Sequence, residues 1–547
     1  MLVILISMFP ILNATLCLLL KKSTSRSMIT GTIVGLAIFL LKDGFSFENI
    51  ILIGNTTVTT ITDNVTVLIS ILLLFILVYL IQNSRIILAL NDLTEDYMYS
   101  PKRIVIFLII FGIIFSLDDY LACIAMGTIF TESTIKQGFS KEKIAFMINI
   151  TAVSCCCISP FSSWMPVLKS ALSVSGVNET VIYQTLPYNY SALFGIFIVI
   201  FIGLFRPRAF NSIPNSSRQA KSIMEKEKKN YFEMIVFFVI ISILIVSLIL
   251  MIFIFPCSNA VIKSSMISIV IALPLFIWAK AINYSQIKHS IRKALKSTWD
   301  LSKLLLSIWL LTNVCNNILG LADNISAYTN NANFPIIILP AAIFALSGIF
   351  AFSTGSAYGT FGLFIPLATQ FTNNVNSTIQ TMTIAAAIAG SLMAASSFAS
   401  DTLELTAKNT QSNKEYLQFA QLPYSILLYT ISFLSFFVSG ICVQYGKIFT
   451  IIVPIIISIC ISIEHLILMP LLYVHIQRTI SNILTFWLSI RTCNYKITTH
   501  PYPPLKYTFH SIYIMMEKYI QLKIKIFLHK ILSFTTLSYL LKIPGLL

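Results

Sequence analysis

Three aspartates lie inside stretches of the sequence that are otherwise apolar. Asp118 and Asp119 are adjacent in the middle of residues 104–130, and Asp401 follows a run of small residues in 378–402. Ionisable side chains are rare in membrane spans because hydrocarbon does not solvate charge, so those present usually serve transport. Two adjacent carboxylates in a medium of low dielectric constant need a proton or a cation as compensation. We therefore expect these aspartates to bind the transported ion, although each could alternatively cap a half-helix or mark a membrane boundary.

Hydroxyl-bearing residues occur in two further segments that lie in the middle of apolar runs. Residues 159–164 contain Ser162 and Ser163, and residues 353–360 contain Thr360 together with two glycines. Glycine permits an unwound helix, and serine or threonine oxygens with freed carbonyls ligate hard cations such as sodium. Small residues also promote helix packing in membranes, but their position relative to the aspartates favours a role in the site.

The composition indicates which solvent these segments meet. Hydrophobic residues make up 56% of the 547 residues, charged residues only 11%, and the mean hydropathy is +0.85. A soluble protein of this size would need a far more charged surface. We expect an all-α polytopic membrane protein with about 11–13 transmembrane helices, since roughly 20 apolar residues cross a bilayer. Apolar runs fall near residues 2–20, 28–42, 64–82, 104–130, 144–173, 187–205, 232–256, 261–279, 301–322, 335–370, 378–402, 424–445 and 448–474.

The distribution of positive charge orients these spans. The net charge of +16 comes from lysines and arginines in connections, notably residues 206–231 and 280–296. Cytoplasmic loops carry this excess, so both stretches are predicted to be cytoplasmic, and a nucleic-acid partner is not indicated. We expect a multi-pass protein of the bacterial inner membrane. Residues 511–542 could form a basic amphipathic helix on the anionic inner leaflet, or a tail without function.

Counting the crossings predicts an interrupted backbone near the paired aspartates. Residues 83–103 are expected inside the cell and residues 178–186 outside, so 104–173 must cross the membrane an odd number of times. Its two polar-interrupted runs then require either three crossings or one crossing with re-entrant hairpins. Broken backbone is tolerated at that depth only where protein buries it or water reaches it. This region is therefore expected to line a transport pathway.

A weak internal repeat links the two polar regions. Tyr120 recurs as Tyr358 at an offset of 238 residues, and the run 159–163 recurs in outline as 397–401 at the same offset. The first copy starts inside and the second outside, so the copies are inverted, an arrangement typical of secondary transporters with broken helices. We divide the chain into N-terminal helices, the first repeat, a basic loop with linking helices, the second repeat, and a last span with the basic tail: residues 1–102, 103–205, 206–334, 335–445 and 446–547.

Other classes of protein lack support in the sequence. All six histidines lie outside the two repeats, and neither an HExxH motif nor a phosphate-binding loop occurs. These motifs would indicate a membrane metalloprotease or a primary pump. The ten cysteines show no paired spacing typical of metal sites. A membrane enzyme or a non-transporting scaffold is therefore the weakest hypothesis, and we expect no cofactor and no resident metal.

Together these motifs make the chain similar to the NhaC family of sodium/proton antiporters, whose relatives include organic-acid exchangers. The resemblance covers about residues 100 to 430, and two positions depart from it: Asn149 and Ala394 stand where the family usually has acids. It implies a binding role for Asp118, Asp119, Tyr120, Thr360, Ser400, Asp401 and Thr402. The matching segments are DDY at 118–120, Gly127-Thr128, SKEKIAF at 140–146, the Pro-x-Ser-x-Trp pattern at 160–164, LPYNY at 186–190, STGSAYGTFGLFIP at 353–366, SDT at 400–402 and QLPY at 421–424.

The function predicted from the sequence is secondary active transport. In the first hypothesis sodium and protons compete for the aspartates, and neutral oxygens of Ser162, Ser163, Thr360, Ser400 and Thr402 complete the site. The alternative is a sodium- or proton-coupled transporter or exchanger of an organic anion, such as a dicarboxylate or an amino acid. The expected partners are sodium ions, protons or a small substrate, and the lipid bilayer. Self-association into a homo-oligomer is compatible with this prediction.

Overall fold

In the computed structural model, the described helices belong to a unit that spans Met1–Tyr473. The basic loop at 206–231 and the tail at 511–542, for which the sequence made predictions, lie outside the described residues. The described residues are 2–19, 24–85, 97–98, 100–160, 162–173, 177–205, parts of 235–250, 257–321, 324, 336–372, 375–397 and 399–460.

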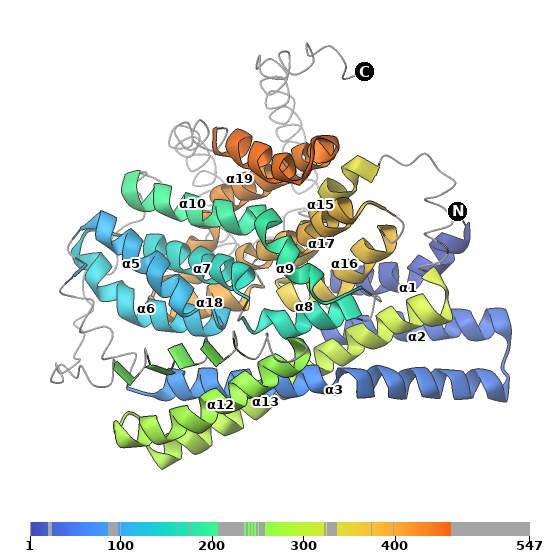
Figure 1. Ribbon diagram of the computed structural model, residues 1–547, viewed down its shortest axis with the longest axis horizontal. Coiled ribbons are helices and arrows are strands. Elements are labelled where there is room, and N and C mark those ends of the chain that lie inside the picture. Colours follow the sequence, from blue (N-terminus) through green and yellow to red (C-terminus); the bar gives the residue numbers. More distant parts are fainter. Residues whose placement is uncertain are drawn as a thin grey trace, which may run out of the picture. The chain divides into compact units, whose positions relative to one another are not determined.

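Helices from the N-terminal part and the middle of the chain pack together as one group. The helix α3 contacts both α12 and α13, and α13 also contacts α2; Figure 1 shows these four along one edge. A π-helical turn, η3, ends α13. The bounds are α1 Leu2–Leu19, α2 Thr24–Asp43, α3 Phe47–Asn83, α12 Cys257–Trp278, α13 Tyr284–Asn313 and η3 Val314–Ile318.

The first repeat consists of short helices with breaks between them. Ser100 caps its first helix by accepting a hydrogen bond from the Arg103 amide, and Pro101 occupies the first helical position, where no amide donor is required. Ser140 caps a later helix in the same way through Lys143. The elements are α5 Pro101–Ile114, α6 Asp119–Lys136, α7 Lys141–Ile158, α8 Trp164–Ser173, α9 Val181–Thr185, η1 Leu186–Tyr188 and α10 Tyr190–Phe205.

The second repeat reproduces this order of helices and breaks. Its elements are η4 Ile336–Ile338, α15 Leu339–Thr354, α16 Ala357–Phe371, α17 Ser377–Ser391, η5 Leu392–Ser396, α18 Asp401–Asn409, α19 Lys414–Ile441 and η6 Cys442–Tyr445. The helices α15, α16, α17 and α18 begin 236 to 238 residues after α5, α6, α7 and α8, respectively. Packing between the repeats is reciprocal, because α6 contacts α18 while α16 contacts α8. The predicted repeat is thus confirmed.

The first two helices of each repeat fold back on each other. The rings of Phe111 on α5 and Phe130 on α6 are 5.7 Å apart, whereas a continuous helix would separate these positions by about 28 Å. Phe350 on α15 and Phe364 on α16 are 5.4 Å apart, against about 21 Å along a straight helix. Both pairs are therefore helical hairpins. Residues 104–173 therefore comprise a helical hairpin, α5–α6, followed by the broken helix pair α7–α8.

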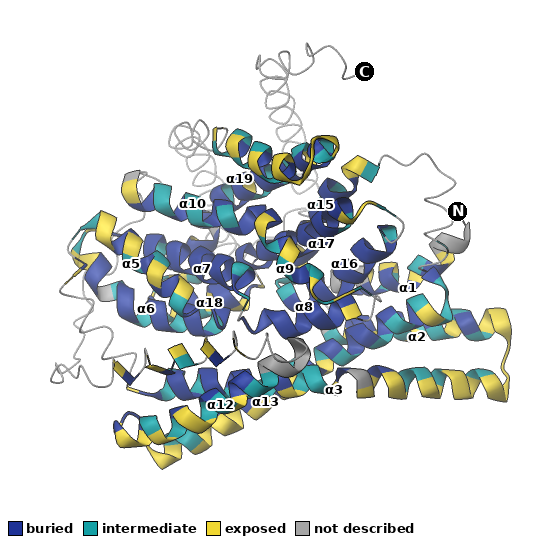
Figure 2. Cartoon of the chain, viewed as in Figure 1, coloured by how far each residue is buried: buried dark blue, intermediate teal, exposed yellow. Residues whose placement is uncertain are grey.

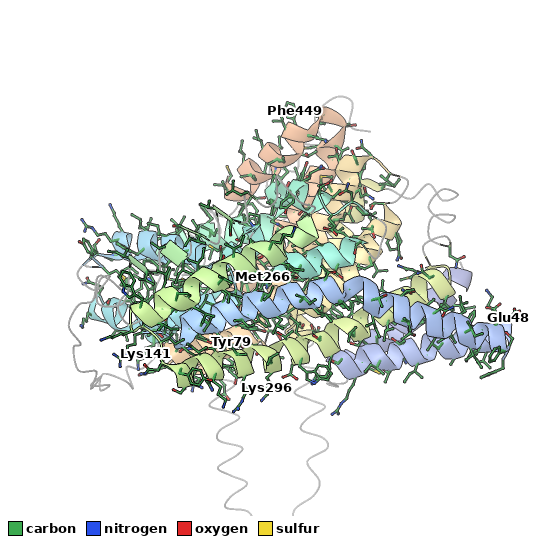
Figure 3. The ribbon with its side chains drawn as sticks, turned by 60° about the horizontal axis from the view of Figure 1, so that its bottom comes forward. Glu48, Tyr79, Lys141, Met266, Lys296 and Phe449 are labelled. Atoms are coloured by element: carbon green, nitrogen blue, oxygen red, sulfur yellow. The ribbon has the colours of Figure 1, made fainter. Side chains whose placement is uncertain are left out.

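The two hairpins enter from opposite ends of the long helix α19. This helix has 28 residues, which corresponds to about 42 Å. The base of the second hairpin meets its C-terminal end, where a Cβ built on Gly440 would lie 2.1 Å from the Ile337 carbonyl oxygen. At its other end Gln411 accepts a hydrogen bond of 3.4 Å from Lys141, at the base of the first hairpin. Figure 3 shows Lys141 far from Phe449, which follows α19. The repeats are therefore inverted, as predicted.

The described residues are almost entirely helical and include no strand, so the all-α polytopic prediction is confirmed. Five helices are long and apolar enough to cross a membrane, and the pair Val181–Tyr188 and Tyr190–Leu204, bent by 40°, would be a sixth. The expected runs 104–130 and 144–173 are divided among shorter helices. Nearly all residues of α7, α8, α16 and α17 are buried, and α7 and α17 lie at the centre of the fold (Figure 2).

Candidate functional site

The turn between α5 and α6, which we call the tip of the first hairpin, is hydrogen-bonded to the break between the end of α7 at Ile158 and the start of α8 at Trp164. Asp118 is 1% exposed and caps α6, because its Oδ1 accepts a hydrogen bond of 2.9 Å from the Leu121 amide. Its Oδ2 accepts a second bond of 2.9 Å from the Ser163 hydroxyl. The Ser163 amide in turn donates to the Leu117 carbonyl at 2.7 Å. Asp118 therefore orders the tip and connects it to the break.

Asp119 occupies a different environment although it is the next residue. Its carboxyl group is buried, with 5% of the side chain exposed, and Oδ1 has no hydrogen-bond partner among the described residues. Trp164, at the start of α8, lies beside this carboxyl group, and its indole N–H is also without a partner there, as is the hydroxyl of Ser162. Buried polar atoms in folded proteins are nearly always hydrogen-bonded. These three groups are therefore available to an ion, a proton or a small polar ligand.

The break before α18 supplies the third aspartate. Ser400 caps this helix by accepting a bond of 3.2 Å from the Leu403 amide, and its hydroxyl lies 3.1 Å from that of Thr402. Asp401 is the first residue of α18 and is exposed, unlike the other two aspartates. Its Oδ2 accepts a hydrogen bond of 3.4 Å from the hydroxyl of Tyr120. The break of the second repeat is thus joined to the first hairpin.

The tip of the second hairpin connects both breaks. The hydroxyl of Tyr358 is 3.4 Å from that of Ser163. On the other side Gly355 adopts φ +68°, and a Cβ there would lie 2.6 Å from the backbone of Ala399, so only glycine fits this contact. The two tips and the two breaks therefore form a continuous ring of contacts. Four helices, α6, α8, α16 and α18, begin at this ring, and helix N-termini favour negative charge.

The structure groups the predicted site residues unequally. Asp118, Asp119, Ser162 and Ser163 form one cluster, and Tyr120, Asp401, Ser400 and Thr402 form a second, with Asp119 and Tyr120 adjacent in the chain. Thr360 is buried one turn into α16, where its hydroxyl donates to the Ser356 carbonyl at 2.8 Å. Sequence reasoning did not include Trp164 and Tyr358 among the site residues. A signal was present for both, because Trp164 ends a family-like motif and Tyr358 is the repeat counterpart of Tyr120.

The positions where the sequence departs from the family pattern belong to a neutral network. The Asn149 amide donates to the Ala395 carbonyl at 2.9 Å and to Gln421 Oε1 at 3.5 Å. Gln421 donates to Gln418 at 3.1 Å, and Gln418 donates to the Ser396 carbonyl. Carboxamides thus satisfy the carbonyls at the end of η5 and hold it against α7 and α19. Ala394, also at this point, packs with apolar neighbours.

Within the described part of the chain, no three His, Cys, Asp or Glu side chains are grouped in a way that could hold a metal ion. The chemistry at the ring is therefore that of carboxylates, hydroxyls and helix termini, which suits alkali cations and protons. Inverted repeats, broken helices and polar groups at the breaks together define a secondary transporter of the membrane.

Comparison with known proteins identifies the family. The family model described as "Na+/H+ antiporter family" matches residues 156–441, which is more than half of the chain, and the protein belongs to that family. The match includes both breaks and the second hairpin. It begins within α7, after the first hairpin that carries Asp118 and Asp119.

Individual relatives are distant. An uncharacterized protein of Haemophilus influenzae is 22% identical over 475 residues, which are 79% of this chain and 91% of that protein. The Alcanivorax borkumensis YdaH transporter has a crystal structure with a TM-score of 0.52 at 14% identity, covering 74% of this chain and 90% of that one. Neisseria gonorrhoeae MtrF, described with a class of antimetabolite efflux pumps, gives a TM-score of 0.48 at 12% identity and covers 75% and 94%. The likeness to YdaH supports the transporter fold.

Proposed function

We propose that this protein exchanges sodium ions for protons across the inner membrane of a bacterial cell. The observation that carries the proposal is the buried carboxyl group of Asp119, whose Oδ1 has no partner among the described residues and which lies beside Trp164. A buried carboxylate needs a compensating cation, and a proton and a sodium ion can each supply it. Because the two cannot occupy the same oxygen together, release of one permits binding of the other.

The two adjacent aspartates have different roles in this proposal. Asp118 uses both oxygens in hydrogen bonds to the Leu121 amide and the Ser163 hydroxyl, so it fixes the tip of the first hairpin. Asp119 exchanges the cation and the proton. The Ser162 hydroxyl, which is buried and unpartnered within the described residues, would be a neutral ligand of sodium, while Ser163 positions Asp118.

The second cluster would lead ions to this site. Asp401 is exposed and accepts a hydrogen bond from Tyr120, the residue after Asp119, so a cation coming from water would meet Asp401 before it reaches Asp119. Ser400 and Thr402 would offer hydroxyl oxygens there. Thr360 would act indirectly, by stabilising the first turn of α16 behind the second tip.

The alternative substrate is an organic anion coupled to sodium or protons. Two observations favour it: four helix N-termini begin at the ring, and the unpartnered Trp164 indole donates rather than accepts hydrogen bonds. The positive ends of broken helices bind anionic substrate groups in several transporters. In this case Asp119 would hold the coupling cation and the anion would bind beside it.

The test measures sodium-dependent pH change in everted membrane vesicles. We expect Asp119→Asn to abolish the change, because the amide carries no charge to exchange. The matched control is Asp300→Asn, which removes an exposed carboxylate paired with Lys303 at 2.6 Å and should leave exchange intact. Unaltered exchange in Asp119→Asn would refute the site. Sodium-driven uptake of a dicarboxylate or an amino acid, without sodium-driven pH change, would favour the alternative.

A further inference from the structure

The half-helices α8 and α18 are equivalent in the two repeats but differ in exposure. With their first residues superposed, Asp401, Glu404 and Lys408 of α18 correspond to Trp164, Val167 and Ala171 of α8. This superposition pairs residues 237 positions apart, whereas the sequence match between 159–163 and 397–401 pairs residues 238 positions apart. The three positions share one helix face. On α8 they are 1%, 1% and 2% exposed, whereas on α18 all three are exposed.

The exposed face of α18 is charged and therefore faces water rather than lipid. Glu404 forms an ion pair of 2.8 Å with Lys414, and Asp401 and Lys408 flank it along the helix. Charges of this kind inside a membrane protein line aqueous cavities. The equivalent face of α8 presents one aromatic and two apolar side chains, which exclude water. Water therefore reaches the ring along the face of α18 but not along the equivalent face of α8. We call the first side the wet, or exposed, route to the ring and the second the buried route.

A pair of equivalent tyrosines joins the repeats on these two routes. Tyr120 of the first hairpin bonds Asp401 at the start of α18. Tyr358 of the second hairpin reaches Ser163, the residue before α8, at the same distance of 3.4 Å. Each tyrosine thus connects a hairpin tip to the opposite repeat. The Tyr120 contact is on the exposed route, and the Tyr358 contact is on the buried one.

The buried route is closed by an aromatic cluster around Tyr358. The tyrosine is 7% exposed, and its ring meets Trp164 at 6.5 Å and Phe361 at 6.2 Å, both edge to face. Trp164 and Phe361 are themselves 5.1 Å apart. Such pairs stabilise each other beyond simple burial. Removing the Tyr358 hydroxyl or its ring would therefore loosen this closure.

The wet route leads to the side on which the first hairpin enters. From Asp401 the helix α18 runs to Asn409, and Gln411 beyond it bonds Lys141. The lysines at 141, 408 and 414 gather at this end. Basic residues concentrate on the cytoplasmic side of membrane proteins, so the wet route opens toward the cytoplasm.

We propose that Tyr358 is a positioning residue that closes the outer route to the transport site, and that the structure is the cytoplasm-open state. Tyr120 and Asp401 make the equivalent contact on the inner route, but the adjoining face of α18 is charged and exposed, so this contact alone does not close that route. Closing the inner route would accompany opening of the outer one. This inference rests on the transport function proposed above, but it does not depend on which ion or anion is carried.

The experiment uses one cysteine on each half-helix, at equivalent positions. Val167→Cys and Glu404→Cys are introduced separately into the full chain with Cys460→Ser, because Cys460 is exposed. A membrane-impermeant maleimide is applied to right-side-out and to everted vesicles, and the labelling of the parent protein is subtracted. We expect Glu404→Cys to react in everted vesicles and Val167→Cys to react in neither preparation.

Substitution of the tyrosines then tests the closure. Tyr358→Phe should raise labelling of Val167→Cys in right-side-out vesicles by roughly fivefold, the population shift expected from one lost hydrogen bond. Tyr358→Leu, which also removes the ring, should raise it further. The matched change Tyr120→Phe should not raise it. Unchanged labelling in both Tyr358 variants, or labelling of Glu404→Cys only from outside, would overturn the proposal. Because labelling needs no sodium, it remains informative if sodium/proton exchange is not found.

Discussion

The two hairpin tips share one backbone plan and differ in chemistry. Residues 118–120 of the first tip read Asp-Asp-Tyr, and residues 356–358 of the second read Ser-Ala-Tyr at equivalent positions. Both tips cap the following helix with a side-chain oxygen, since Asp118 accepts from Leu121 and Ser356 accepts from Gly359. The capping function is thus common to both repeats, whereas the buried carboxylate at Asp119 is found only in the first.

This difference separates what the fold requires from what transport requires. A serine caps a helix about as well as an aspartate, so a helix end does not explain two consecutive carboxylates. The tyrosine is present in both tips and connects the repeats in both. Asp119 is therefore the one tip residue that the shared architecture of the two repeats does not explain. We infer that it serves the transport chemistry instead.

The largest effect is expected when the two tips are made alike. Asp119→Ala copies Ala357 and should weaken apparent sodium affinity by about a hundredfold or more, the scale of losing one charge of a buried pair. Adding Ala357→Asp should not restore exchange, because the indole of Trp164 lies beside the carboxyl group of residue 119. Sodium-dependent pH change in everted vesicles measures both variants. Recovery to within a few-fold of the parent would show that the two tips are interchangeable.

A glycine distinguishes how the two tips are packed. Gly355→Ala at the second tip places a Cβ 2.6 Å from the backbone of Ala399 at a positive φ of 68°, and we expect a loss of roughly 2 kcal/mol or more in stability. Gly138→Ala is the control, because φ is +80° there but no atom lies within 4 Å of the added Cβ. Thermal unfolding in detergent compares them. An equal loss in both variants would mean that the contact with Ala399 is unimportant.

The neutral network between the repeats should show a smaller effect. Asn149→Ala removes the donor to the Ala395 carbonyl and leaves a buried acceptor unpaired, which costs about 1–3 kcal/mol. Asn149→Asp keeps the size of the side chain but replaces the donor by an acceptor, so it should destabilise at least as much when no cation is bound. Thermal unfolding with and without sodium tests this. Stabilisation of Asn149→Asp by sodium would indicate that a second cation site can form there.

The smallest effect is expected on the exposed half-helix. Glu404→Gln breaks the ion pair with Lys414, but an exposed pair contributes less than about 1 kcal/mol. We therefore expect nearly unchanged thermal stability, with exchange within about twofold of the parent because the unaltered charge at Asp401 still attracts cations. A large loss of exchange would instead show that Glu404 takes part directly in the path of the ion.

The sequence by itself determined the class of the protein and the frame of its repeats. Apolar runs predict membrane spans because twenty such residues cannot remain in water, and the side-chain caps at Ser100 and Ser140 mark where helices begin because their oxygens satisfy free amides. Recurrence of Tyr120 as Tyr358, together with that of the run 159–163 as 397–401 at the same offset, predicted the second repeat. These are local properties of the chain, so they do not depend on which segments later become neighbours.

Only the tertiary structure decided which groups of the ring meet. Whether α5 and α6 continue or fold back depends on contacts such as Phe111 with Phe130, which lie nineteen positions apart in the chain. The difference between Asp118 and Asp119 likewise depends on Ser163, a residue of another helix break. The exposure of Asp401 follows from the different packing of α18 and α8. Long-range packing selects among arrangements that the same local signals permit, and this is the physical reason why pairing and access could not be predicted from the sequence.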